Sequence, residues 1–277
     1  MGHKPNPAQI KHPYQSTNAP LSRSSPQLTR QNGDGEHNIV IASLPAGHYG
    51  ITPVAMAAAH MLSSFSSVKF GLMVGIGGER GIRLGDVVVS QPSATVDGFV
   101  ETGSLNCPPR VLLNAVSALQ GKHEIMESEI PRFLDDIQKK YPLMAKPRQG
   151  PGYVFQGVEN DQLFQADYHH ERGNDCRACD AEKQIMREER YTHDPYIFYG
   201  TMASGNKVIK DPAEREQLLQ TGCLCVETEA AGLMNDFPCL VIRGICDYCD
   251  TAYAKELLNT MDVADVTDDT RGTNDHV

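Results

Sequence analysis

Short apolar runs and helix-forming segments alternate along most of this chain. The runs that read as strands cover residues 38–44, 69–74, 86–90, 196–200, 223–226 and 239–245. Helical patterns cover residues 52–62, 109–120, 130–140 and 212–220, a stretch from Glu229, and residues 251–258. This alternation predicts an α/β fold in which helices flank a mostly parallel central sheet. The length of 277 residues suits a single large domain.

Composition divides the chain into three parts. Residues 1–37 are rich in Pro, Ser, Asn, Gln and Gly without a sustained apolar period, which predicts a flexible leader. We expect the folded domain over residues 38–258 and a flexible acidic tail over 259–277. Inside the domain, residues 142–195 are rich in Pro, Gly and charge. They predict a long surface excursion, where functional residues often lie.

Charge and hydropathy narrow the partners and the compartment. A formal net charge of −10 argues against nucleic acid, because phosphate-binding surfaces need clustered Lys and Arg. The sequence contains no apolar run long enough to span a bilayer and no N-terminal secretory signal. We therefore expect no membrane partner and an intracellular, cytoplasmic location. Several of the eight cysteines lie in apolar runs, which fits reduced thiols.

Polar or glycine-rich residues follow three of the predicted strands. These are Gly75-Ile-Gly-Gly78, Val226-Glu-Thr-Glu229 and Cys246-Asp247. In open parallel sheets, ligands bind beyond the carboxyl ends of the strands. Any one of these segments alone is more often a turn or a cap. The spacing after Gly75 is not the dinucleotide fingerprint, because Arg80 stands where the third glycine would be, and we expect no cofactor.

Together these segments resemble a known enzyme superfamily. Residues 202–209 (MASGNKVI), 226–232 (VETEAAG) and 241–247 (VIRGICD) follow the order and approximate spacing of nucleoside phosphorylases, uridine phosphorylases and methylthioadenosine nucleosidases. Residues 71–78 and 82–90 extend the likeness, which covers about 38–258. The sequence looks most similar to the fungal type, often fused to NACHT, ankyrin or tetratricopeptide-repeat regions. The resemblance implies cleavage of the N-glycosidic bond of a purine nucleoside or nucleotide by a homo-oligomer.

The resemblance makes Asp247 the candidate catalytic acid. Cleavage of an N-glycosidic bond builds positive charge on the ribose and negative charge on the leaving base. An acid that protonates the base therefore lowers the barrier. Asp247 follows the most apolar strand pattern of the chain. A cleft at the end of such a strand would raise the pKa of the carboxyl by desolvation, so that the group could hold a proton near neutral pH.

The resemblance also assigns candidate ribose-binding residues. Glu229 matches a carboxylate that accepts hydrogen bonds from the ribose 2′- and 3′-hydroxyls. Thr228 stands where the family usually has a Met that packs under the sugar. Glu227 is either a second substrate-binding carboxylate or a solvated charge that caps the following helix.

Two further pairs complete the candidate substrate site. Val208 and Ile209 match the segment that lies along the purine, where they would supply an apolar wall; the alternative is a plain buried strand end. Gly75 and Gly77 would allow a ligand to approach the backbone closely.

The identity of the attacking group depends on the segment that resembles the phosphate site of the phosphorylases. Those enzymes hold phosphate there with an Arg and a Ser or Thr, whereas this chain has Met73 and Ile76. Phosphate would lack its charge-assisted partners. Hydrolysis by water is therefore favoured over phosphorolysis.

Three departures from the family support an alternative function. The leader contains no equivalent of the family's opening Glu, Thr228 replaces Met, and the segment between Asp247 and Thr251 is shortened. An incomplete or open site weakens electrostatic catalysis. The alternative is a degenerate, inactive domain that binds a nucleoside or a protein. An abridged gene model would also explain the gaps.

One cluster has the residue types of a metal site. His169, Cys176 and Cys179 could contribute to a tetrahedral zinc site. The second Cys or His pair of the usual motif is absent. A loop with reduced thiols, or a local disulfide, is therefore the favoured interpretation.

Overall fold

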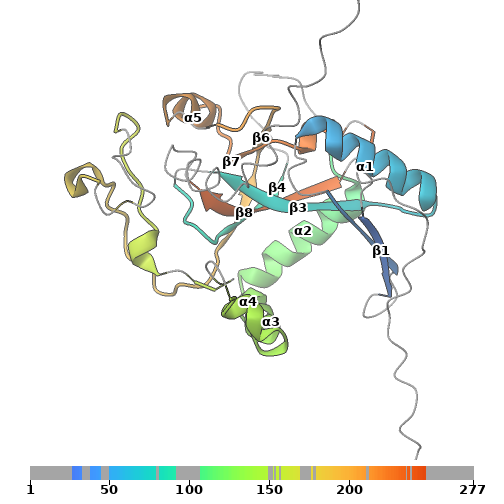
Figure 1. Ribbon diagram of the computed structural model, residues 1–277, viewed down its shortest axis with the longest axis horizontal. Helices are drawn as coiled ribbons and strands as arrows, with labels where there is room; N and C mark the ends of the chain where they lie inside the picture. Colours follow the sequence, from blue (N-terminus) through green and yellow to red (C-terminus); the bar gives the residue numbers. More distant parts are fainter. Residues whose placement is uncertain are drawn as a thin grey trace, which may run out of the picture.

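Six strands form a mixed central sheet in the order β5-β4-β8-β3-β7-β6 in the computed structural model (Figure 1). The strands are β3 (Gly71–Gly78), β4 (Val87–Ser90), β5 (Ile197–Gly200), β6 (Met202–Ser204), β7 (Cys225–Glu227) and β8 (Cys239–Asp247). The pairs β3–β8, β4–β5 and β6–β7 are parallel. The pairs β4–β8 and β3–β7 are antiparallel. This arrangement confirms the α/β fold with a largely parallel sheet. The sequence analysis does not predict the two antiparallel strand pairs.

The structure describes most of the chain between residues 27 and 247. The described residues are 27–32, 38–44, 50–78, 81–91, 107–148, 152, 154–155, 157–168, 176, 179–209, 212–234, 236–237 and 239–247. The predicted helix at 251–258, the tail at 259–277 and His169 lie outside them, as does most of the predicted leader.

Strands β3 and β8 form the longest pair of the sheet. They run parallel from Gly71 opposite Cys239 to Gly78 opposite Asp247, with a register shift at Gly77/Gly78. Both strands are rich in the aliphatic residues that fit a sheet covered by helices. The pairing places the ends of both strands at the same edge of the sheet, which is where the sequence predicts the site.

Helices cover the two faces of the sheet (Figure 1). On one face, α1 (Ile51–Ser64) and the 3-10 turn η4 (Ala230–Gly232) pack on β3 and β8. The core there includes Val54, Ala58, Leu233, Cys239 and Val241. On the opposite face, Leu112 and Val116 of α2 (Arg110–His123) pack against Val89 and Leu240. The alternation of side chains along the strands separates these two cores.

Helix α1 begins two residues earlier than the pattern of Thr52 followed by Pro53 predicts. Thr52 is the predicted N-cap, whereas Gly50 occupies that position with a φ of 95°, a conformation that favours glycine. Helices α3 (Ile130–Lys140) and α5 (Pro212–Leu219) lie where the sequence predicts them. The predicted helix from Glu229 is reduced to the turn η4.

A separate hairpin precedes the central sheet. Strand β1 (Gln27–Asn32) pairs antiparallel with β2 (Asn38–Ser43). Strand β1 falls inside the segment predicted to be a flexible leader. The prediction that residues 38–44 form a buried strand is wrong, because Ile39 and Ile41 are each 45% exposed. Strand β2 joins this two-stranded hairpin and not the six-stranded sheet.

The excursion at 142–195 contains little regular structure, as predicted. Its described elements are the short helices α4 (Pro142–Ala145), η1 (Val158–Asn160) and η3 (Ala181–Lys183). A single bridge between Phe164 and Gln184 joins its two arms. Among the described residues, no helix has the length and apolar character needed to cross a membrane.

Candidate functional site

Asp247 is the last residue of β8. Its backbone lies opposite Gly78, where β3 also ends, and its side chain lies outside the described part of the structure. Val226 of β7 pairs with Gly78 on the other side of β3, so the backbones of Asp247, Gly78 and Val226 lie side by side across three strands. Strand β7 runs antiparallel to β3, so its carboxyl end points the opposite way, and Gly75–Gly78, which the sequence places after a strand, lies within β3.

A buried arginine connects this region. The Nη2 atom of Arg243 donates to Oε2 of Glu227 at 2.5 Å, and these two side chains are 1% and 0% exposed. The Glu227 carboxylate also accepts from the backbone N–H groups of Glu229 and Ala230, at 3.0 Å and 2.9 Å. Glu227 does cap the turn that follows, but as a buried ion-paired group. The expected alternative of a solvated capping charge is wrong on this point.

Glu229 is held from two sides. The Oγ1 of Thr228 donates to Oε1 of Glu229 at 2.6 Å, and Nη2 of Arg243 lies 3.3 Å from its Oε2. The side chain of Glu229 remains 21% exposed. Each carboxylate oxygen offers more than one acceptor position, so both oxygens retain capacity for further donors. Thr228 thus orients the carboxylate, a role that a Met could not perform.

Gly75 and Gly77 make room for the arginine. Strand β3 lies between β8, which carries Arg243, and β7, which carries Glu227. A Cβ at Gly75 would lie 2.7 Å from Nη1 of Arg243, and one at Gly77 would lie 3.4 Å from its Cβ. The guanidinium also donates from Nη1 to the Met73 carbonyl at 3.3 Å. The close approach that these glycines permit is therefore made by the Arg243 side chain, which crosses β3.

Val208 and Ile209, the predicted apolar wall of the purine site, differ in their exposure to solvent. Ile209 is buried and packs with Val226 and Leu218, whereas Val208 is 46% exposed. Of the two, only Val208 is thus open to contact by a ligand. Ile209 is buried, as the alternative expects, but it lies beyond β6, which ends at Ser204, and not at a strand end.

Met73 and Ile76 point away from each other. Met73 packs into the core beside α1, and Ile76 is 61% exposed on the other face. Neither side chain supplies a cation or a hydroxyl.

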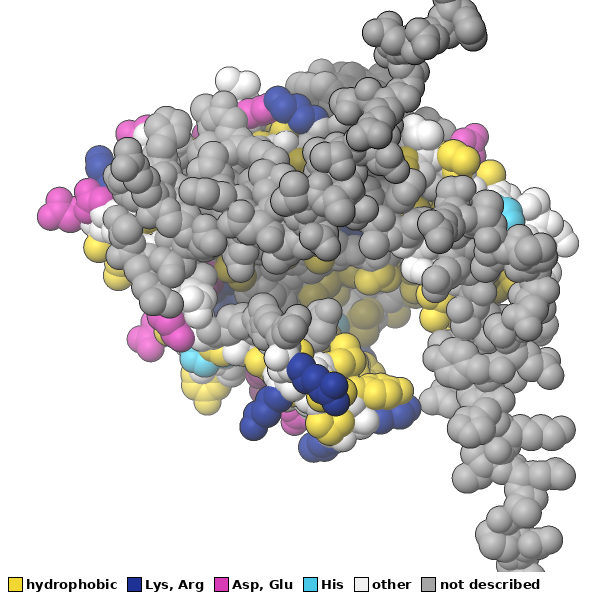
Figure 2. Space-filling model, in the orientation of Figure 1, with side chains coloured by type: hydrophobic (Ala, Val, Ile, Leu, Met, Phe, Trp, Pro, Cys, Tyr) yellow, Lys and Arg dark blue, Asp and Glu magenta, His cyan; other side chains and the backbone are white. Residues whose placement is uncertain are grey.

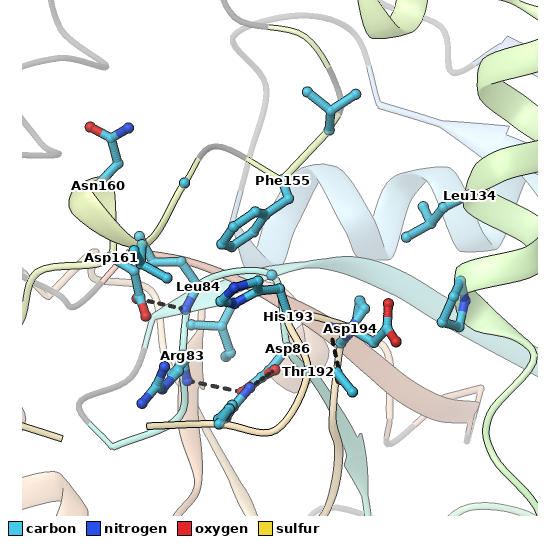
Figure 3. Close-up of a pocket in the computed structure, with 18 of the residues that line it drawn as sticks. Arg83, Leu84, Asp86, Leu134, Phe155, Asn160, Asp161, Thr192, His193 and Asp194 are labelled. Carbon is cyan, nitrogen blue, oxygen red and sulfur yellow. Dashed lines mark hydrogen bonds and ion pairs between the residues drawn. The ribbon is translucent and has the colours of Figure 1, made fainter. Parts of the chain in front are cut away.

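A cavity of about 590 Å³ opens beside the end of β8 (Figure 3). Its walls come from residues 83–86, helix α3, the excursion and the end of β8. They include Leu84, Leu134, Phe155, Val158, Ile245 and Cys246. The cavity contains none of the predicted substrate-binding residues, but Cys246 precedes Asp247 directly. The excursion thus contributes a hollow to the sheet edge where the candidate acid lies.

Asp86 organises the floor of this cavity. Its carboxylate, 2% exposed, receives two hydrogen bonds from Arg190 at 2.6 and 2.7 Å and one each from the backbone N–H groups of Arg83 and Tyr196. The hydrogen bond with Asp86 raises the pKa of Arg190 above its ordinary value. The Arg190 guanidinium also lies over the Tyr196 ring, 4.2 Å from its centroid. These contacts anchor the segment before β5 to the start of β4.

An aromatic pair lines the cavity wall. The rings of Phe155 and His193 stack with centroids 4.8 Å apart and an interplanar angle of 13° (Figure 3). Phe155 is 53% exposed, and both residues line the cavity.

Sequence reasoning missed Arg243, Asp86 and the cavity. The signal for Arg243 was a charged residue in the otherwise apolar run 239–245, because such a charge is buried only when it is paired. Asp86 had no distinguishing signal, since its partner Arg190 lies 104 positions away.

Two of the three candidate metal ligands, Cys176 and Cys179, lie within the described residues, and His169 lies outside them. Cys176 and Cys179 are not joined in a disulfide, and Cys179 N–H donates to the Cys176 carbonyl in a turn. Among the described residues, which exclude His169, no cluster of three or more His, Cys, Asp or Glu side chains has the arrangement of a metal site.

Comparison with other proteins gives one sequence relative. No protein-family model matches the chain. The chain is 40% identical over 241 residues to a nucleotide-binding leucine-rich repeat (NLR)-like protein of Hyaloscypha variabilis, and the match covers 78% of this chain and 22% of that protein. The chain thus spans about a fifth of the length of this relative.

Solved structures with a similar arrangement include nucleosidases. The 5′-methylthioadenosine/S-adenosyl homocysteine nucleosidase of Helicobacter pylori has a TM-score of 0.45 and 14% identity, covering 84% of this chain and 77% of that chain. The corresponding nucleosidase of Colwellia psychrerythraea 34H, in complex with adenine, has a TM-score of 0.46 and 14% identity, covering 86% and 77%. A futalosine hydrolase mutant of Helicobacter pylori has a TM-score of 0.44 and 14% identity, covering 84% and 77%.

Proposed function

We propose that this chain carries a nucleoside phosphorylase-like domain that hydrolyses the N-glycosidic bond of a purine nucleoside or nucleotide. The observation that carries the proposal is the fixed carboxylate of Glu229. Thr228 holds one of its oxygens at 2.6 Å and the buried Arg243, on the strand that ends with Asp247, holds the other at 3.3 Å. A partly exposed carboxylate held in this way is prepared to receive a pair of hydroxyl donors.

Glu229 would bind the ribose. Vicinal hydroxyls present two O–H donors at a spacing that one carboxylate can accept, and hydrogen bonds to an ionised acceptor are strong. The carboxylate is already oriented by its neighbours, so less conformational entropy is lost when the sugar binds. The negative charge of Glu229 also favours the positive charge that develops on the ribose as the bond breaks.

Asp247 would protonate the leaving base. The oxygen of a water molecule attacks the anomeric carbon, and the bond between that carbon and the base nitrogen breaks. The electron pair of this bond moves to the base, which takes the proton of Asp247, and the attacking water loses a proton to solvent. The products are free base and ribose or ribose phosphate, so atoms and charge balance without a cofactor.

Water is the better attacking group. Met73 and Ile76 provide neither charge nor hydroxyl, and the positive charge of Arg243 is matched by Glu227 at 2.5 Å. A phosphate ion would therefore find no free cation among these side chains and would meet the negative charge of Glu229.

The experiment measures release of free base from a panel of purine nucleosides and nucleotides by chromatography, with and without phosphate. We expect release without phosphate, and loss of about 10²-fold or more in the Asp247→Asn variant, the scale of general-acid catalysis. The exposed Asp236 gives the matched control Asp236→Asn, which should retain full activity. Release only in phosphate buffer would make the reaction phosphorolysis, and full activity in Asp247→Asn would remove Asp247 from the mechanism.

A second candidate is a domain that binds a nucleoside without turnover. The exposed Val208 and the open cavity beside Cys246 favour it, because a site open to water stabilises charge development poorly. Calorimetric binding of a nucleoside that Glu229→Gln abolishes, with no base released, would support this function. The 40% identity to an NLR-like protein supports a further proposal, that the domain serves as one part of a larger protein of that kind.

A further inference from the structure

Helix α3 carries a row of apolar side chains that is open to solvent. Phe133, Ile137 and Tyr141, the residue that ends the helix, recur at every fourth position and are 51%, 39% and 51% exposed. Within the described structure, no residue of α3 or α4 is buried. Figure 2 shows hydrophobic side chains beside Lys and Arg side chains at the bottom of the view, where Figure 1 draws these two helices.

The neighbouring side of α3 already has a function in the fold. Pro131, Leu134 and Gln138 line the cavity and therefore face the excursion. Phe133 and Ile137 belong to the next row of side chains around the helix and are not part of the cavity wall. Short helices are stable in proteins chiefly because an apolar face packs against a partner, and the row at Ile137 lacks one.

Opposite charges lie along one edge of this row. Asp136 and Lys140 are one helical turn apart on the same side of α3, and both are exposed. The Lys140 ammonium lies 5.4 Å from the centroid of the Tyr141 ring. An acidic and a basic group thus border the apolar row, on opposite sides of the level of Ile137.

We infer that the α3 helices of two copies of this chain pack antiparallel around a two-fold axis at Ile137. Such an axis places residues that stand equally far before and after Ile137 opposite each other, so the surface must complement itself. Phe133, four positions before Ile137, then meets Tyr141, four positions after it. Aromatic side chains of this kind are enriched in the cores of protein interfaces.

The charges fit the same arrangement. Asp136 precedes Ile137 by one position and Lys140 follows it by three. Across the axis these two residues therefore stand two positions apart, or about 3 Å along the helix, which the long Lys side chain spans. A parallel pair of helices would instead place Asp136 beside Asp136 and Lys140 beside Lys140, and like charges repel. The order of the charges thus favours the antiparallel pair.

This inference goes beyond the proposed function and does not depend on it. Pairing at α3 would fix the cavity wall that Leu134 and Gln138 form in each copy, whether or not the domain is an enzyme.

Charge exchange in the full chain tests the surface. Asp136→Lys leaves only positive charge at this edge and Lys140→Asp only negative charge. Sedimentation equilibrium should show a dimer for the native chain and a dimer Kd at least about tenfold higher for each variant, because two ion pairs become two repulsions. An equimolar mixture of the two variants should form a heterodimer with a Kd close to that of the native dimer, since each edge again meets its opposite charge.

Three outcomes of this experiment would overturn the inference. The first is a monomeric native chain. The second is a dimer that both variants leave unchanged, which would place the contact on another surface, such as the exposed β3 residues Leu72 and Val74. The third is a mixture that associates no better than either variant alone.

A cysteine on the axis gives an independent measurement. In a Cys107→Ser background, which removes an exposed thiol, Ile137→Cys should link two chains after mild oxidation, because a disulfide needs close Cβ atoms. The matched control is Lys139→Cys, an exposed position on the far side of the helix. Mass spectrometry should find the 137–137 disulfide at about fivefold or more the yield of 139–139. Equal yields would contradict the two-fold axis at Ile137.

Discussion

Arg243 on β8 reaches across β3 to Glu227 on β7, and their buried side chains meet at 2.5 Å. Two backbone N–H groups also donate hydrogen bonds to the Glu227 carboxylate. The Nε atom of Arg243 has no hydrogen-bond partner within the described structure. The pair joins β8, β3 and β7, with Arg243 opposite Gly75 of β3. Its geometry therefore decides the position of Glu229 as well as the packing of the sheet.

Replacement of Arg243 by Met should destabilise the fold strongly. The Glu227 carboxylate would remain buried without its cation, a loss of roughly 3–5 kcal/mol in comparable buried pairs. Urea denaturation measures the change in the free energy of unfolding. The double variant Arg243→Met/Glu227→Gln should recover part of the loss, and a double variant as unstable as the sum of both singles would contradict the coupling.

Gly75→Ala should disturb the same pair. The new Cβ would lie 2.7 Å from Nη1 of Arg243, and the guanidinium cannot move freely because both Glu227 and the Met73 carbonyl hold it. We expect a loss of about 1–3 kcal/mol. Gly244→Ala is the control, since a Cβ there meets no atom within 4 Å. Equal stability of the two variants would show that Arg243 is not confined.

Thr228→Val should weaken ribose binding without unfolding the domain. The substitution keeps the shape and removes the hydroxyl that donates to Glu229. If the domain is active, KM should rise about fivefold, corresponding to roughly 1 kcal/mol for one hydrogen bond. Thr228→Ser retains the donor and should restore KM. Steady-state kinetics distinguish this outcome from a loss of stability, which thermal unfolding would report.

Asp86→Asn should destabilise the fold and the segment at residues 190–196 that lines the cavity. The substitution removes the negative charge that pairs with Arg190. It also places the NH2 group of the Asn side chain where a carboxylate oxygen now accepts hydrogen bonds from N–H donors. A loss of roughly 3–5 kcal/mol in unfolding free energy is expected from a broken buried pair, with faster hydrogen exchange at residues 190–196. Asp194→Asn changes an exposed carboxylate in the same cavity and should leave both measurements unchanged.

The thiol of Cys239 should make the free energy of unfolding depend on pH in the alkaline range. Burial raises the pKa of its thiol from 9.0 to about 11. Because the folded pKa lies above the unfolded value, the contribution is fully present below pH 9 and is lost as the pH rises through 11. Denaturation midpoints measured between pH 8 and 11 should fall more for the native protein than for Cys239→Val. In the folded protein at pH 8, iodoacetamide should modify the exposed Cys107 and spare Cys239.

Local patterns predict strands and helices well where a segment's own residues decide its structure. The apolar runs that became β3, β4 and β8 and the helix at Ile130–Lys140 follow from composition and spacing alone. Strand β6 is only three residues long, and β1 is polar. Each of these two exists because a partner strand completes its hydrogen bonds, which the segment itself does not reveal.

Glu227 and Glu229 could be chosen as site residues from the sequence, because they follow a strand end and match a family pattern. The contacts of these two side chains could not be predicted from the sequence. Glu227 finds its cation 16 positions away because β3 inserts between β7 and β8 and carries glycines at the crossing.

By itself, the sequence determined the α/β class and the main strands, since hydrophobic periodicity and breakers act over a few neighbouring positions. Only the tertiary structure decided which charges are buried together, which strand faces α2 leaves open, and that the excursion builds a cavity beside β8. Those outcomes depend on strand order and register, which bring residues more than a hundred positions apart within hydrogen-bonding distance, as Asp86 and Arg190 show.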